Sequence, residues 1–139
     1  MKKSIFTLLL ALAAWTAGAQ VRFETESTDA VHEMAVREGK MVFVDLYASW
    51  CPPCRAMDKQ VFSRSDVAEF LHARFIPVKY DVDRPTGRAL MQKYDASAVP
   101  TYLIFTSDGE LLGRISGASD AKTFMSDVSR IAARAGAKK

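Results

Sequence analysis

Residues 41–55 read MVFVDLYASWCPPCR, an apolar run that leads directly into two cysteines separated by two prolines. Residues 41–49 are β-branched and apolar apart from Asp45, which predicts a strand buried on both faces of a sheet. Proline is tolerated in the first turn of a helix, so residues 52–61 are predicted to be helical. The two cysteines therefore lie where a central strand meets a helix N-terminus, which is where open α/β sheets place their functional sites.

Outside this stretch, hydrophobic periodicity predicts helices and strands in alternation. Helices are expected at 28–38, from Ser65 or Asp66, at 87–94 and from Ser119 to about Ala135, and strands at 76–82, 101–106 and 111–116. The turn SDG at 107–109 separates two apolar runs and predicts an antiparallel hairpin. Together these elements predict an α/β fold with a central mixed β-sheet flanked by helices on both faces.

Length and composition restrict the class of protein. The chain has 139 residues, which suits a single domain, and its 49% hydrophobic and 25% charged residues are typical of a soluble globular protein. The formal net charge is +3, and basic residues are interspersed with acidic ones. This distribution argues against a nucleic-acid partner.

The first residues have the layout of a secretory signal peptide. Residues 1–19 read MKKSIFTLLLALAAWTAGA, with a basic start, an apolar run and a small-residue end. The apolar run is short for a membrane span, which needs about 20 residues, although an uncleaved anchor is the alternative. We therefore expect a signal peptide at 1–19, a single domain at 20–139 and a periplasmic or secreted location.

Cys51 and Cys54 are the only cysteines of the chain. The loop between them is too short for a disulfide to stabilise the fold by restricting the unfolded chain. A Cys-x-x-Cys pair at a helix start indicates a dithiol switch instead. A zinc site with His32 and His72 is an alternative, but neither histidine has a companion ligand at short spacing, so no metal or cofactor is expected.

The position of each cysteine predicts its role. Cys51, at the positive end of the helix dipole, is expected to be the attacking thiolate. Cys54, one turn further in and more buried, is expected to resolve the mixed disulfide. Pro52 and Pro53 have no N–H, so the nearest backbone donor to the Cys51 sulfur is that of Cys54. A weakly stabilised thiolate makes the dithiol a better reductant, although the prolines could equally serve only to rigidify the turn.

Asp45 is an acid inside an apolar strand. Burial should raise its pKa, and it could then accept the Cys54 proton through a water molecule. Lys79, in the strand predicted at 76–82, is a candidate charge partner. The alternative is a partly exposed strand end with an ordinary salt bridge. Pro100 directly precedes a predicted strand, where a trans bond is the usual state.

The sequence as a whole resembles the thioredoxin family. The resemblance rests on FVDLYASWCPPCR at 43–55, VPTYLIF at 99–105 and ISG at 115–117, and it covers roughly residues 25–135. The stretch VDLYASWCPPCRAMDKQVFSRSDV looks particularly like the C-terminal thioredoxin-like domain of the membrane disulfide reductase DsbD, and like small exported thioredoxin-like proteins.

The resemblance implies the thioredoxin fold and a set of site residues. Cys51 matches the nucleophile and Cys54 the resolving cysteine, while Asp45 and Lys79 match a buried acid and its lysine partner. Four further positions match residues that bind substrate: Trp50, Val99, Pro100 with a cis bond, and Gly117. The backbone of Val99 is expected to pair with an extended substrate segment.

The implied function is an extracytoplasmic thiol–disulfide oxidoreductase that acts on protein disulfides, with the role of reductant favoured. A disulfide oxidase or isomerase is the alternative within this class, and a non-catalytic binding module is another. Because the motif is Cys-Pro-Pro-Cys and not Cys-Gly-Pro-Cys, the direction of electron flow is not implied. The multi-helix membrane part of DsbD is missing from the sequence, so a membrane or soluble thiol electron donor is an expected partner, and the chain is expected to be a monomer.

Overall fold

The computed structural model describes residues 19–137, which form a four-stranded sheet in the order β2-β1-β3-β4. The strands are β1 (Met41–Tyr47), β2 (Phe75–Asp81), β3 (Thr101–Phe105) and β4 (Leu111–Ser116). β1 and β2 are parallel, whereas β3 is antiparallel to both β1 and β4. The predicted mixed sheet is therefore confirmed, including the hairpin between its last two strands.

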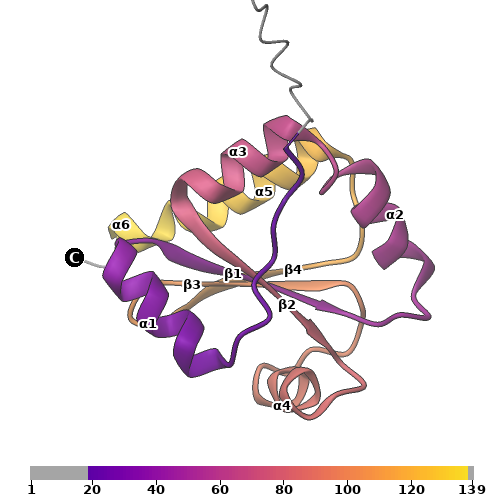
Figure 1. Cartoon of the computed structure of the whole chain (residues 1–139), viewed down its shortest axis with the longest axis horizontal. Coiled ribbons are helices and arrows are strands. Elements are labelled where there is room, and N and C mark those ends of the chain that lie inside the picture. The colour runs from indigo at the N-terminus through magenta and orange to yellow at the C-terminus, as the bar shows by residue number, and fades with distance from the viewer. Residues whose placement is uncertain (1–18, 138–139) are drawn as a thin grey trace, which may run out of the picture.

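Helices cover both faces of the sheet (Figure 1). α1 (Thr28–Glu38) and α4 (Pro85–Lys93) pack on one face. The other face carries α2 (Pro52–Gln60), α3 (Ser65–Arg74) and α5 (Ala121–Ala132), and α5 is followed by the short α6 (Arg134–Ala137). This arrangement confirms the predicted α/β layers.

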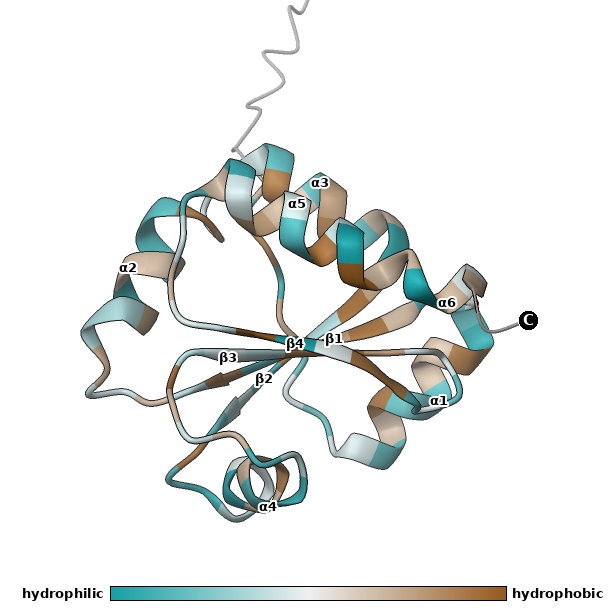
Figure 2. Cartoon of the chain, turned by 180° about the vertical axis from the view of Figure 1, so that it is seen from behind, coloured by the Kyte–Doolittle hydropathy of each residue, from teal (hydrophilic) through white to brown (hydrophobic). Residues whose placement is uncertain are grey.

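The alternation of side chains along β1 produces two separate cores. Phe43 packs with α2, α3 and α5, whereas Val42 and Val44 pack on the α1 and α4 side. The first core is rich in aromatic rings, and Phe43 stacks on Tyr102 at 5.4 Å between ring centroids. Figure 2 shows the hydrophobic colours concentrated in the strands and on the sides of the helices that face them. Asp45 shares the face of Phe43, so it enters an apolar core.

Three elements start at a different residue from the sequence prediction, each for a local reason. α4 begins at Pro85 because proline suits the first position of a helix. β2 includes Phe75, which pairs in register with Met41. α5 begins at Ala121 because the side chain of Asp120 accepts a hydrogen bond from the Thr123 N–H and caps the helix.

Each edge strand of the sheet hydrogen-bonds to another part of the chain. Glu24 pairs with β2, since its N–H donates to the Pro77 carbonyl and its carbonyl accepts from the Lys79 N–H. On the other edge, Arg134 donates to the carbonyl of Leu112 in β4. Open strand edges promote aggregation, and the pairing of Glu24 occupies part of the β2 edge.

Most of the predicted signal peptide at 1–19 lies outside the described residues. Within residues 19–137, no helix has the length and apolar character needed to cross a membrane.

Candidate redox site

The two cysteines lie at the junction of β1 and α2. Cys51 is the N-cap of α2, with Pro52 and Pro53 in the first turn, and its sulfur is joined to that of Cys54 in a disulfide. Both residues are buried, at 2% exposure for Cys51 and 4% for Cys54. The expectation that Cys54 is the more buried of the two is therefore wrong in the disulfide form.

The sequence predicts that the nearest backbone N–H to the Cys51 sulfur is that of Cys54, and the structure agrees. The N–H of Cys54 donates to Cys51 Sγ at 3.2 Å. An N-cap side chain normally accepts from the second or third helical residue, and Pro53 removes the first of these donors. Within the described part of the chain, the Cys54 N–H is thus the one backbone donor to this sulfur.

Two loops meet the disulfide from the other side. The Val99–Pro100 bond is cis, as the family resemblance implied, and the Val99 carbonyl oxygen lies 3.6 Å from Cys51 Sγ. The Gly117 N–H donates to the Pro100 carbonyl at 2.9 Å, and Gly117 has a φ of +89°, which favours glycine. Val99 therefore lies beside Cys51, and Gly117 is hydrogen-bonded to the adjacent Pro100, although the role of these residues in binding substrate stays a prediction.

Trp50 is a large exposed apolar side chain next to the disulfide, with 62% of its surface accessible. Its indole Nε1–H donates to Asp83 Oδ2 at 2.9 Å, and the Asp83 N–H donates to Asp81 Oδ1. Sequence reasoning assigned no function to Asp83. β1 and β2 run parallel, and Asp81 pairs with Tyr47. Asp83 and Trp50 therefore both follow the same end of the sheet.

Asp45 is buried, with 2% exposure, so the alternative of a partly exposed strand end is wrong. Burial raises the pKa of Asp45 from its ordinary 3.8 to about 7, against the opposing effect of Lys79. Lys79 Nζ lies 3.5 Å from Asp45 Oδ2. The predicted ion pair is present, and the carboxyl is poised to gain or lose a proton near neutral pH.

Lys79 has a second and closer acidic partner, Asp58 of α2, at 2.5 Å. The ammonium group also lies over the rings of Tyr47 and Phe23, at 4.6 Å and 5.2 Å from their centroids. Sequence reasoning missed Asp58. It follows Cys54 at i+4 on the same helix, and this spacing could have placed it on the Cys54 side.

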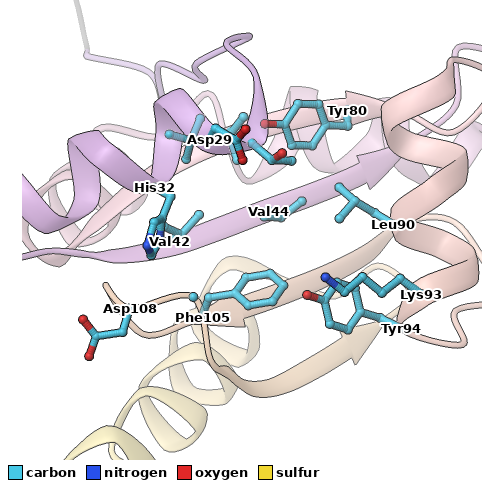
Figure 3. A pocket seen from close by; sticks show the side chains of 14 residues that line it. Asp29, His32, Val42, Val44, Tyr80, Leu90, Lys93, Tyr94, Phe105 and Asp108 are labelled. Atoms are coloured by element: carbon cyan, nitrogen blue, oxygen red, sulfur yellow. The ribbon is translucent and has the colours of Figure 1, made fainter.

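A cavity of about 290 Å3 lies on the opposite face of the sheet, between α1 and α4 (Figure 3). His32 lines this cavity, whereas His72 of α3 accepts a hydrogen bond from the Arg22 N–H. Residues 19–137 contain no group of three or more His, Cys, Asp or Glu side chains that could hold a metal ion. The structure therefore does not assemble the alternative zinc site from the two cysteines and the two histidines.

Comparison with known proteins identifies the family. A thioredoxin-like domain model matches residues 28–128. The chain is 33% identical over 117 residues to the thiol:disulfide interchange protein DsbD 2 of Pseudomonas aeruginosa, covering 79% of this chain and 20% of the relative. It is 39% identical over 88 residues to thioredoxin-2 of Pyricularia oryzae, covering 63% of this chain and 47% of the relative. The chain thus spans less than half the length of either relative.

A solved structure agrees with these sequence matches. The solution structure of a thioredoxin from Thermus thermophilus superposes with a TM-score of 0.74 at 26% identity, covering 86% of this chain and 92% of that one. The matched family segment contains both cysteines, and the structure joins them in a disulfide. The chain therefore belongs to the thioredoxin-like family.

Proposed function

We propose that this chain is an exported reductant that transfers electrons from a Cys51–Cys54 dithiol to disulfides in other proteins. The observation that carries the proposal is the position of Cys51 Sγ at the N-terminus of α2, where one backbone N–H reaches it. A helix N-terminus favours the thiolate, which is the attacking species. Cys54, one turn behind, is placed to displace the substrate sulfur.

The reaction balances without a cofactor. The Cys51 thiolate attacks a substrate disulfide, forms a mixed disulfide and releases one substrate sulfur, which takes a proton. Cys54 then passes its proton through a water molecule to ionised Asp45 and attacks Cys51 Sγ. The second substrate sulfur leaves as a thiolate and takes up a proton from water, and Asp45 releases its proton to water and returns to its ionised form. The substrate gains two electrons and two protons, and the chain ends as the disulfide. With a pKa of about 7, Asp45 suits a base that works near neutral pH.

The surface beside Cys51 suits an extended polypeptide. Val99 is half-buried next to the disulfide, and its backbone can pair with a substrate strand. Trp50 offers an exposed ring on one side of Cys51, and Gly117 has open space where a side chain would project. These features support a protein substrate whose disulfide lies in an accessible, extended segment.

The two prolines support the reducing direction. A thiolate that receives one backbone hydrogen bond is a poorer leaving group than one that receives two, so the disulfide is harder to reduce. Export is supported by the layout of residues 1–19. A reductant in that compartment needs electrons from a second thiol protein, in the membrane or soluble.

Turnover of a protein disulfide such as insulin tests the proposal, with Cys51→Ser and Cys54→Ser as a matched pair. We expect both variants to lose turnover. Cys54→Ser should accumulate a mixed disulfide through Cys51, and Cys51→Ser should accumulate none. Wild-type turnover by Cys51→Ser would contradict the proposal, and efficient oxidation of substrate dithiols without reduction would favour the oxidase alternative.

A further inference from the structure

Two buried polar atoms near the redox site make no hydrogen bond within residues 19–137, and they belong to neighbouring residues. They are Oδ1 of Asp45 and the hydroxyl oxygen of Tyr102. The two residues are direct cross-strand partners in the antiparallel pairing of β1 and β3. Buried polar groups without a partner are rare in folded proteins, so two of them side by side require an explanation.

The surroundings of Tyr102 make its hydroxyl hard to explain by packing alone. The ring stacks on Phe43 and meets Phe62 and Phe124 edge-on, with centroids 5.4–5.9 Å apart. Phenylalanine would make the same ring contacts without burying a polar group. An unpaired buried hydroxyl destabilises the fold, so tyrosine at this position indicates a hydrogen-bond partner.

Asp45 supplies a matching acceptor. In register, Lys79, Asp45 and Tyr102 form one row across β2, β1 and β3. Lys79 approaches Oδ2 from one side of this row, which leaves Oδ1 for the residue on the other side. Directly opposed residues in an antiparallel pair lie close together, and one water can bridge these two atoms, which do not bond to each other directly.

We propose that Tyr102 is a positioning residue for Asp45: its hydroxyl donates to one buried water, which in turn donates to Oδ1, opposite Lys79. This role rests on the proposed function, in which Asp45 takes the proton of Cys54. The link fixes the orientation of the carboxyl and stabilises its charged form. Burial raises the pKa of Tyr102, so the hydroxyl keeps its proton and remains a donor throughout the working range.

Other groups near Asp45 also influence its charge. They are Lys79 from β2, which lowers the pKa of Asp45, and Asp58 from α2, which raises it. Tyr47 from β1 lies beneath the Lys79 ammonium group. The buried residues that α5 contributes to this core are apolar: Phe124, Val128, Ile131 and Ala132. Within this set, Tyr102 is the neutral donor whose removal changes neither the net charge nor the cysteines.

The test measures the pKa of Asp45 by carbon-13 NMR of its carboxyl group in the full chain, with Asp45→Asn identifying the signal. In Tyr102→Phe we expect the pKa of Asp45 to rise by about 1, because the carboxylate loses a donor. The control is Tyr80→Phe, which removes a hydroxyl that bonds to the Glu26 carbonyl on the other face of the sheet. The control should leave the pKa of Asp45 unchanged.

Turnover should follow the same pattern. The acid limb of the pH–rate profile should shift to higher pH in Tyr102→Phe. In an Asp45→Asn background, Tyr102→Phe should produce no further shift. An unchanged pKa of Asp45 in Tyr102→Phe would overturn the inference. If that variant fails to fold, the ring carbon that bears the hydroxyl of Tyr102 in the wild-type chain should titrate together with Asp45, and a flat response would overturn it.

The two proposals fail in different experiments. The pKa of Asp45 can be measured without turnover, so the inference on Tyr102 can fail while the cysteines remain active. Conversely, wild-type turnover by Cys51→Ser would refute the proposed function even if Tyr102→Phe changed the pKa of Asp45.

Discussion

At the scale of single residues, the buried carboxyl of Asp45 links redox chemistry to stability. The pKa of Asp45 is about 7 in the folded chain, above its ordinary 3.8, because burial disfavours the charged form. The folded state therefore binds more protons than the unfolded state between these two values. It follows that the stability contributed by this group is present at low pH and is lost as pH rises from about 4 to about 7.

Replacing Asp45 with asparagine removes this cost. At pH 8 we expect Asp45→Asn to raise the free energy of unfolding by up to about 4 kcal/mol, since a pKa difference of 1 corresponds to about 1.4 kcal/mol. The fall in stability between pH 4 and pH 7 should flatten in urea titrations. Asp108→Asn, at an exposed acid of the β3–β4 turn, serves as the control. An equally steep fall in Asp45→Asn would refute the assignment.

The indole of Trp50 provides a second prediction at this scale. Because Asp83 accepts from Trp50 Nε1, Asp83→Ala should free the ring beside the disulfide. One exposed hydrogen bond contributes about 1 kcal/mol, so KM for a protein disulfide should rise about fivefold while kcat changes little. Asp108→Ala should leave both constants unchanged. A selective loss of kcat would indicate that Trp50 acts on the reaction itself.

Not every residue of the site could be predicted from the sequence. The sequence predicted the two cysteines because a closely spaced pair at a helix start is unusual. It predicted Asp45 because an acidic residue is unusual within an apolar strand. Asp58 and Asp83 were missed because their partners, Lys79 and Trp50, are brought near them only when α2 and the end of β2 are placed in three dimensions.

At the scale of elements, the first turn of α2 controls how well the Cys51 thiolate is stabilised. Pro53→Ala restores an N–H at the second helical position, from which an N-cap side chain commonly accepts a hydrogen bond. Pro52→Ala restores an N–H at the first helical position, from which N-cap side chains do not commonly accept. Pro53→Ala should therefore make the disulfide easier to reduce, by about 30 mV for each tenfold change in the equilibrium constant. Pro52→Ala should have a smaller effect. Equal potentials in wild type and both variants would show that the prolines only rigidify the turn.

The start of α4 depends on a close approach between two elements. A Cβ at Gly87 would lie 2.1 Å from the Asp81 carbonyl oxygen, which is backbone and has no room to move. Gly87→Ala should thus lower the free energy of unfolding by about 2 kcal/mol, although alanine normally favours helices. Gly136→Ala, in α6 with no atom within 4 Å of its Cβ, should be neutral or slightly stabilising. Denaturant unfolding of both variants would measure the difference, and a stabilised Gly87→Ala would contradict this packing.

The order of the main helices and strands followed from the sequence because periodicity and turn residues are local signals. The starts of α4 and α5 did not, because the capping contacts of Asp120 and the fit of Pro85 shift a helix by a residue or two. The coverage of β2 by residues around Glu24 was also missed, since a short pairing at a sheet edge has little periodicity of its own.

At the scale of the whole molecule, the sheet separates two environments. The α2, α3 and α5 side holds the larger aromatic cluster, Asp45 and the helix that carries the cysteines, while the α1 and α4 side holds the second core and the cavity of Figure 3. The redox site thus occupies one end of one layer. Substitutions in the cavity, such as His32→Ala, should leave the reduction potential of the cysteine pair unchanged, which redox titration would check.

The central claim is that Cys51 and Cys54 form a reversible two-electron couple poised to donate electrons. Equilibration of the purified chain with glutathione redox buffers, followed by alkylation and mass measurement, tests it most directly. We expect a single transition between dithiol and disulfide at a potential nearer that of thioredoxin, about −270 mV, than that of a strong oxidant, about −120 mV. A chain that never formed the disulfide in oxidised buffer would contradict the couple, and a potential near −120 mV would contradict its role as a reductant.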